Sequence, residues 1–215
     1  MNQSDQGKSP RRTQEERSDR MKRRILDAAF VVLKERGYAG FTTAEVAKRA
    51  GVSRGAQVHH FPSKNDLVLA TMEYVFDMSR SYGVALAKNL PFSDDPLDAV
   101  IKDAATFYFS DYFYVGLDWL LTGCKDAEFK KQALVIMRNY RQPVEDEWQK
   151  TMLDHGMSPE HAADILWLTI NIVRGAAIRA IWSPDMKQVE RLLFVWRDMV
   201  SNYLEGSLKR RNRVS

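Results

Sequence analysis

The sequence predicts an all-α protein in which a small N-terminal group of helices precedes a larger helical bundle. Three observations lead to this prediction. Helix-capping residues recur along the chain, and apolar residues follow them at intervals of three and four. No alternating strand pattern or hairpin turn separates the apolar runs.

Caps and glycines delimit the N-terminal helices. A capping box at 13–16 opens the first expected helix, whose periodic apolar residues end at Gly37. A second box at 42–45 opens a helix that Gly51 closes, and a short third helix follows. A third box at 63–66 opens a longer helix.

Further helix starts carry a polar cap directly before a proline, at Asp95-Pro96, Ser158-Pro159 and Ser183-Pro184. These boundaries divide the chain into four expected parts. They are a flexible basic arm at 1–12, a three-helix domain at 13–66, a helical bundle at 67–206 and a basic tail at 207–215.

The composition indicates a globular protein with a basic N-terminal part. Of the 215 residues 45% are hydrophobic, and the single cysteine, Cys124, cannot form an internal disulfide. Without an apolar run near ~18 residues or a secretory signal pattern, we expect a cytoplasmic protein with no membrane contact. Residues 1–66 hold 14 Lys and Arg against 8 Asp and Glu, a difference of +6, whereas the remainder holds 18 against 20. This asymmetry fits either a module that faces a polyanion or an uneven solvated surface.

Residues 42–61 have the spacing of a helix-turn-helix unit, with a glycine turn between two short helices. At roughly 100° per residue, we expect Gln57 and Val58 to lie on the side of Phe61, which packs on the preceding helix. The outward face then carries small or polar residues, namely Gly55, Ala56, His59 and, at its rim, His60. A face this slim and polar suits the major groove of DNA, which is about 12 Å wide.

Two residues at helix starts are candidates for contacts with the DNA backbone. Thr43 lies where free N–H groups and the helix dipole favour a phosphate oxygen. Lys64 lies in the first turn of the next helix, which is unfavourable for a cation unless a phosphate balances it. The alternative for Lys64 is an ordinary surface lysine.

The segment at 22–68 resembles the DNA-binding signature of the tetracycline-repressor (TetR/AcrR) family of bacterial transcription regulators. The positions in register are Thr43, Ala47, Ala50, Gly51, Val52, Ser53, Gly55, His60, Phe61, Ser63, Lys64 and Leu67. The resemblance implies a homodimer with a C-terminal ligand-binding domain. Carried over by position, it implies that Arg54 and Ala56 approach base edges and that His59 faces the DNA. It also implies that Thr43, His60 and Lys64 touch the DNA backbone.

The chain departs from the family pattern at Gln57-Val58, where the family usually has Leu-Tyr. Val58 cannot make the backbone contact that the family's tyrosine commonly makes, so the contact is lost or passes to His59. Gln57 is either a half-buried polar residue that bonds the backbone or a reader of adenine, a base that glutamine can bind through two hydrogen bonds.

Aromatic residues at 107–120 exceed what one helix face can bury, so some are expected to line an apolar ligand cavity. The candidates in this segment are Phe109, Phe113 and Trp119. A helix expected near 126–154 adds Tyr140 and Trp148. Pro143 either bends that helix into a pocket wall or interrupts it without consequence.

The last two helices, near 159–182 and 185–205, are unusually apolar. They are either interior or half of a four-helix bundle between two subunits. The resemblance favours the second alternative, because it implies dimerisation through these helices. Asn171 and Arg174 are polar exceptions that either anchor a carboxylate or amide in the cavity or make hydrogen bonds across the interface.

Other chemistry finds little support in the sequence. Adjacent His59 and His60 diverge by roughly 100° on a helix and cannot readily share one metal ion. Cys124 has no evident partner histidine, and no Walker loop, GxSxG or HExxH motif is present. We therefore expect no enzyme, no cofactor and no metal.

The pattern as a whole predicts a ligand-responsive, sequence-specific DNA-binding transcription regulator, a repressor released by a small apolar or aromatic effector. Its expected partners are an operator in double-stranded DNA, the effector and a second copy of the chain. The arm residues Lys8, Arg11 and Arg12 either contact DNA or belong to a solubilising tail. The alternative function is a helical ligand-binding or protein-interaction module that does not bind an operator.

Overall fold

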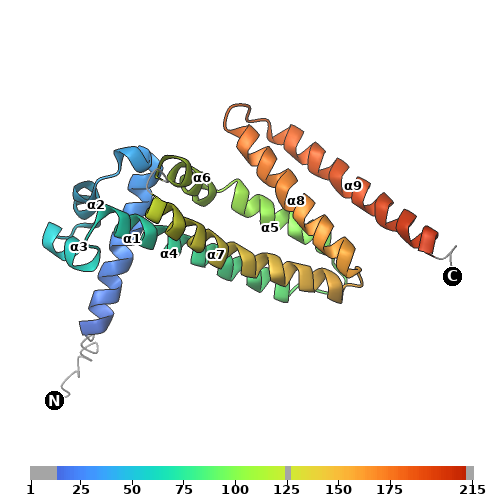
Figure 1. The fold of residues 1–215 in the computed structure, drawn as a ribbon, viewed down its shortest axis with the longest axis horizontal. Helices are drawn as coiled ribbons and strands as arrows, with labels where there is room; N and C mark the ends of the chain where they lie inside the picture. Colours follow the sequence, from blue (N-terminus) through green and yellow to red (C-terminus); the bar gives the residue numbers. More distant parts are fainter. Residues whose placement is uncertain (1–13, 124–126, 212–215) are drawn as a thin grey trace, which may run out of the picture. The chain divides into compact units, whose positions relative to one another are not determined.

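The computed structural model describes residues 14–123 and 127–211, and every element in these ranges is a helix (Figure 1). The predicted all-α fold is confirmed. The predicted arm at 1–12, the cap Thr13 and Cys124 lie outside the described residues. By packing, the chain divides into two compact units between Thr71 and Met72. The functional boundary at 66–67 stays a prediction.

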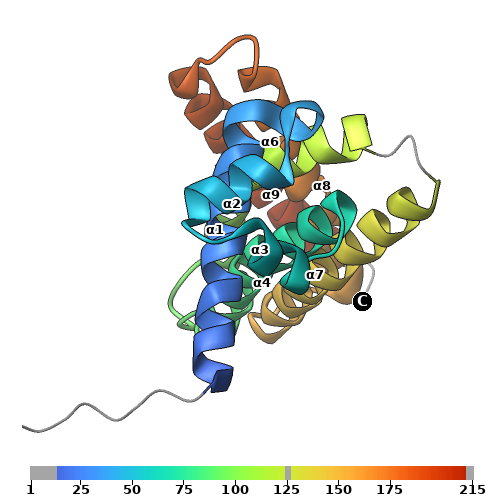
Figure 2. The ribbon, with the colours of Figure 1, turned by 90° about the vertical axis from the view of Figure 1, so that its left-hand side faces the viewer.

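The first unit contains α1 (Gln14–Gly40), α2 (Thr43–Ala50), α3 (Arg54–His60) and the first turns of α4 (Lys64–Lys88) (Figure 2). Helix α1 packs on α2, and α2 packs on α3. The core of this unit is formed by fully buried apolar side chains, which include Ile25, Ala29, Val32, Phe41, Val46, Leu67 and Val68.

Local sequence explains most helix ends in this unit. The Thr42 hydroxyl oxygen accepts a hydrogen bond from the Glu45 amide at 3.3 Å and caps α2. Ser63 and Asp66 form a complete capping box at α4, since each side chain accepts the other residue's backbone N–H at 3.0 Å. The first helical run ends at Gly37 as predicted, because this residue has φ 63° and ψ 175° and is not helical. A positive φ of this kind favours glycine, and a second short helical segment follows the kink as far as Gly40.

The second unit contains the rest of α4 and five further α-helices: α5 (Pro96–Tyr108), α6 (Asp111–Asp118), α7 (Ala127–Asp154), α8 (Pro159–Ala180) and α9 (Met186–Arg211). Helix α8 packs against α5, α7 and α9 (Figure 1). The core between them is apolar and contains Leu97, Ala104, Trp148, Met152, Ile165, Ile170 and Val173.

Two helix caps in this unit, Ser110 and Asp185, were not predicted from the sequence. The aromatic segment at 107–120 is not one helix, because Ser110 accepts the Phe113 amide and opens α6 after α5 has ended. Helix α9 begins at Met186, close to the predicted start near 185, but its cap is Asp185 and not Ser183, since the Asp185 carboxylate accepts the Gln188 amide at 2.9 Å. Asp95 and Ser158 cap α5 and α8 as predicted. A π-helical turn, η1 (Trp119–Gly123), follows α6 directly.

Candidate DNA interface and ligand cavity

A tight turn joins α2 to α3. Gly51 takes the left-handed conformation at φ 63° and ψ 39°, which favours glycine, and closes α2. The Val52 amide bonds the Ala47 carbonyl at 3.1 Å, and the Ser53 hydroxyl oxygen accepts the Ala56 amide at 3.1 Å. These bonds set the entry of α3, a helix of 7 residues that local propensity alone would not stabilise.

Arginines from two helices brace this unit. The Arg24 guanidinium of α1 donates hydrogen bonds to the carbonyl oxygens of Ala50 and Gly51, at the C-terminus of α2. Arg49 of α2 pairs with Glu35 of α1 through two bonds of 2.8 and 2.7 Å, and this hydrogen bonding lowers the pKa of the Glu35 carboxyl. Sequence analysis did not identify these contacts. The basic residues are visible in the sequence, but their partners lie in other helices.

The outward face of α3 is formed by residues that the structure leaves accessible. Arg54, Gly55 and His59 are exposed, whereas Ala56 and His60 are half-buried. Burial lowers the pKa of His60, and the nearby charges of His59 and Lys22 lower it further. The His59 and His60 rings touch edge to face, with centroids 5.3 Å apart.

The structure places Gln57 on the side of Phe61 as predicted and corrects the prediction for Val58. Gln57 is 0% exposed, and its Nε2 donates to the Phe61 carbonyl at 2.9 Å, which fits the alternative of a polar residue that bonds the backbone. Val58 is 43% exposed and does not pack inward as expected. The reason is the helical register: Gln57 lies one turn before buried Phe61 and shares its face, while Val58 is rotated away by about 100°.

Thr43 and Lys64 lie at helix starts, as predicted. Thr43 is the first residue of α2 and is half-buried. Lys64 Nζ donates to the Tyr38 carbonyl at 2.8 Å and lies 4.4 Å from the centre of the Tyr38 ring. Burial lowers the pKa of Lys64, and among the described side chains no carboxylate lies within ion-pair distance of it. An anion placed here would therefore stabilise the charged lysine.

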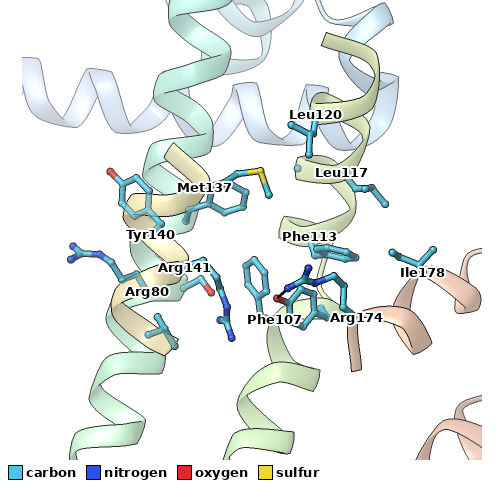
Figure 3. A pocket seen from close by; sticks show the side chains of 15 residues that line it. Arg80, Phe107, Phe113, Leu117, Leu120, Met137, Tyr140, Arg141, Arg174 and Ile178 are labelled. Atoms are coloured by element: carbon cyan, nitrogen blue, oxygen red, sulfur yellow. Dashed lines mark hydrogen bonds between the residues drawn. The ribbon is translucent and has the colours of Figure 1, made fainter. Parts of the chain in front are cut away.

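The second unit encloses a cavity of about 270 Å³ (Figure 3). Its walls come from α4, α5, α6, α7 and α8 and the start of η1, and they are mostly aromatic or aliphatic. The apolar lining includes Phe76, Phe107, Tyr108, Phe113, Leu117, Leu120, Met137, Tyr140, Val144 and Ile178. Such a composition is typical of a site for a small organic molecule.

Three arginines interrupt the apolar wall. Arg80 pairs with Asp77 one turn earlier on α4. Arg141 pairs with Glu145 at 3.3 Å and lies 3.9 Å from the buried carboxylate of Asp103. The third, Arg174 on α8, has no carboxylate partner among the described side chains and bonds the Tyr108 hydroxyl.

That third arginine is Arg174, whose Nη2 donates to the Tyr108 hydroxyl at 3.1 Å. The guanidinium also lies 5.2 Å from the centre of the Tyr108 ring. Arg174 therefore lies in the cavity wall.

A buried carboxylate lies behind Arg141. Asp103 is 4% exposed and accepts a hydrogen bond of 2.9 Å from the indole N–H of Trp148. Burial raises the pKa of Asp103, against the opposing effects of Arg141 and of the Trp148 hydrogen bond.

Only part of the predicted ligand set lines the cavity. Phe113, Tyr140 and Arg174 do, and their contact with a ligand stays a prediction. Trp119 and Trp148 are 0% exposed and belong to the core instead. Phe109 packs against the core of the second unit, and Asn171 donates to the Trp167 carbonyl at 2.8 Å. Sequence analysis missed the lining residues Arg80, Phe107, Tyr108 and Arg141, of which the two arginines resemble surface residues in the pattern.

The last two helices leave large apolar side chains uncovered. Trp167 on α8 is 65% exposed, Trp182 just after it 67%, and Phe194 on α9 66%. Leu168, Leu192, Val195, Met199 and Tyr203 are also exposed. An added Cβ at Gly175 would meet nothing within 4 Å, so a neighbouring backbone has room to approach α8.

Metal binding and membrane insertion are two other functions that a helical chain could have. In the described part of the chain no group of three His, Cys, Asp or Glu residues is arranged to hold a metal ion. Within the same residues no helix has the length and apolar character required to cross a membrane.

Comparison with known proteins assigns the family. Residues 25–71 match the family described as bacterial regulatory proteins, tetR family. The chain is 40% identical over 182 residues to the HTH-type transcriptional regulator CymR of Pseudomonas putida, a match that covers 85% of this chain and 90% of that protein.

Solved structures agree on the fold. A transcriptional regulator from Rhodococcus sp. Rha1 matches with a TM-score of 0.63 at 24% identity, over 86% of this chain and 96% of that one. A regulator from Saccharomonospora viridis, solved in complex with choline, matches with a TM-score of 0.66 at 17% identity, over 85% and 96%. The chain belongs to the TetR family of bacterial regulatory proteins and is a helix-turn-helix transcriptional regulator.

Proposed function

We propose that this regulator is a repressor that binds operator DNA as a homodimer and releases it when a small apolar or aromatic molecule occupies the cavity. The observation that carries the proposal is the accessible face of α3. Arg54, Gly55 and His59 lie exposed on a short helix whose opposite side is fixed by buried Gln57 and Phe61.

The proposed DNA contacts divide by chemistry. Arg54 is suited to a base edge or a phosphate, and Gly55 and Ala56 allow the helix to approach the groove floor. Thr43, His60 and Lys64 are assigned to the backbone, since each lies at or near a helix end of the first unit. His59 takes a DNA-facing position, and Gln57 supports the helix from behind.

The exposed apolar side chains of α8 and α9 support a homodimer. Large contiguous apolar surface is uncommon on monomeric proteins and marks an interaction face. Two copies that join these helices would form a four-helix bundle and cover Trp167 and Phe194. Such a dimer would present two α3 helices to a site with two similar halves.

The cavity supports control by a small molecule. Helix α4 begins with Lys64 and carries the lining residues Phe76 and Arg80 further along. The choline complex of the Saccharomonospora viridis neighbour supports the view that proteins of this fold hold small ligands. A ligand that binds the DNA-incompetent state better by about 3 kcal/mol would lower operator affinity roughly 150-fold.

Footprinting on the DNA upstream of the chain's own coding region tests this function. We expect a protected site with two similar halves centred about 10 base pairs apart, or a multiple of that spacing. A cavity ligand should abolish the protection. If the purified chain binds ligands but protects no DNA, the alternative applies, and the chain is a ligand-binding module without an operator.

A further inference from the structure

Arg174 is the cavity arginine that no carboxylate balances. Arg80 has Asp77, and Arg141 has Glu145 together with Asp103. Among the described side chains, the polar partner of Arg174 is the Tyr108 hydroxyl alone. A half-buried guanidinium without an anion is unfavourable in an apolar wall, and a ligand that supplies the anion would relieve this.

Tyr108 provides a second donor at the same place. The residue is 3% exposed, and its oxygen accepts the Arg174 bond, which leaves its own hydroxyl hydrogen for another acceptor. The guanidinium presents further N–H groups in a planar fork. An oxygen pair placed beside Arg174 and Tyr108 would therefore receive hydrogen bonds from both.

The rest of the cavity is suited to a compact apolar group. Figure 3 shows Phe107 and Phe113 beside Arg174, with Ile178 on the far side and Leu117 and Leu120 above. The volume of about 270 Å³ lies just below the range of about 300–1,000 Å³ that is usual for ligand pockets. The space suits one ring or a short branched chain rather than a multi-ring molecule.

We propose that the effector is a monocarboxylate with a compact apolar body, its carboxylate bound by Arg174 and Tyr108 and its body held among Phe107, Phe113 and Leu117. One unbalanced cation matches one negative charge. A dianion would retain a second, unpaired charge in an apolar site, and a cation would face three guanidinium groups. The proposal rests on the proposed function only in naming this ligand the effector.

Calorimetric titration of the purified full chain, without DNA, tests the charge selectivity. The probes are phenylalkanoates with one to four methylenes, each with its neutral amide and its amine of the same length. We expect at least one acid to bind about tenfold or more tightly than its amide, because a charge-assisted hydrogen bond is lost in the amide. The amines should not bind. If no acid binds, or if an amide or amine equals its acid, the proposal is overturned.

Variants then assign the selectivity to Arg174. Arg174→Gln should lose the preference for acid over amide, whereas Arg174→Lys should retain part of it. Arg179→Gln is the matched control, since Arg179 is exposed on the same helix and does not line the cavity. If Arg174→Gln has the same melting temperature as the native protein but keeps the tenfold preference for acid over amide, the assignment to Arg174 is wrong. Operator release is scored separately: acid binding without release would contradict the role of the acid as effector and leave the carboxylate site at Arg174 intact.

Discussion

Replacing Gln57 by leucine separates the structural role of this residue from base reading. The substitution removes the hydrogen bond from Nε2 to the Phe61 carbonyl, which contributes about 0.5–1.5 kcal/mol. It also removes a buried Oε1 that has no partner among the described residues, which costs the native protein about 1–3 kcal/mol. The Phe61 carbonyl loses its donor in the variant and offsets part of this gain. We therefore expect the free energy of unfolding to change by no more than about 1 kcal/mol.

Operator affinity is the decisive measurement for this variant. A side chain that is 0% exposed and held by Phe61 does not reach a base, so Gln57→Leu should change affinity by less than about twofold. A glutamine that reads adenine would instead contribute about 1–3 kcal/mol, and its loss would weaken binding about 5- to 150-fold. Fluorescence anisotropy with the footprinted site measures the affinity, and urea unfolding at fixed protein concentration measures stability. A loss of fivefold or more in a stably folded variant would refute the buried role.

Three other substitutions test the second unit. Gly116→Ala places a Cβ 2.9 Å from Cζ of Phe76 and should lower the free energy of unfolding by about 1–3 kcal/mol in urea titrations; a neutral result would show that Phe76 moves freely. Burial raises the pKa of Asp103, so its contribution is fully present below the ordinary carboxyl pKa and is lost as pH rises through the folded pKa. The free energy of unfolding, measured from about pH 3 to 7, should therefore fall for the native protein relative to Asp103→Asn as pH rises. A difference between the two proteins that stays constant with pH would contradict the raised pKa. Phe194→Glu should dissociate the dimer in sedimentation experiments, and an unchanged mass would exclude this part of α9 from the interface.

The helix ends were predictable from the sequence because caps act within four residues. Thr42, Ser63 and Ser158 accept the backbone N–H groups that their local sequences indicate. The rotation of α3 was not predictable from its sequence alone. In a helix of 7 residues, a rotation of about 100° decides whether Gln57 or Val58 faces the core. Packing of α3 against α2 sets this rotation.

The cavity shows a different limit of sequence analysis. Counting aromatic residues indicated a pocket but did not separate its lining from the core, since Trp148 and Tyr140 both follow the apolar stripe of α7. Arg141 was missed because a charged residue beside that stripe resembles a solvated one. Only the structure shows that Arg141 lies beside Asp103 and Tyr108 of α5 and therefore belongs to the cavity wall.

The central claim is that the accessible face of α3 reads operator DNA. It is tested most directly by measuring the affinity of native protein and Arg54→Ala for the footprinted site and for a shuffled sequence, over a series of salt concentrations. The exposed Arg138 of the second unit, changed to alanine, is the control. The account predicts a native preference for the site, a fall in affinity with salt, and a loss of about 1–3 kcal/mol of that preference in Arg54→Ala alone. An Arg54→Ala protein that binds the site as tightly and as selectively as the native chain would contradict it.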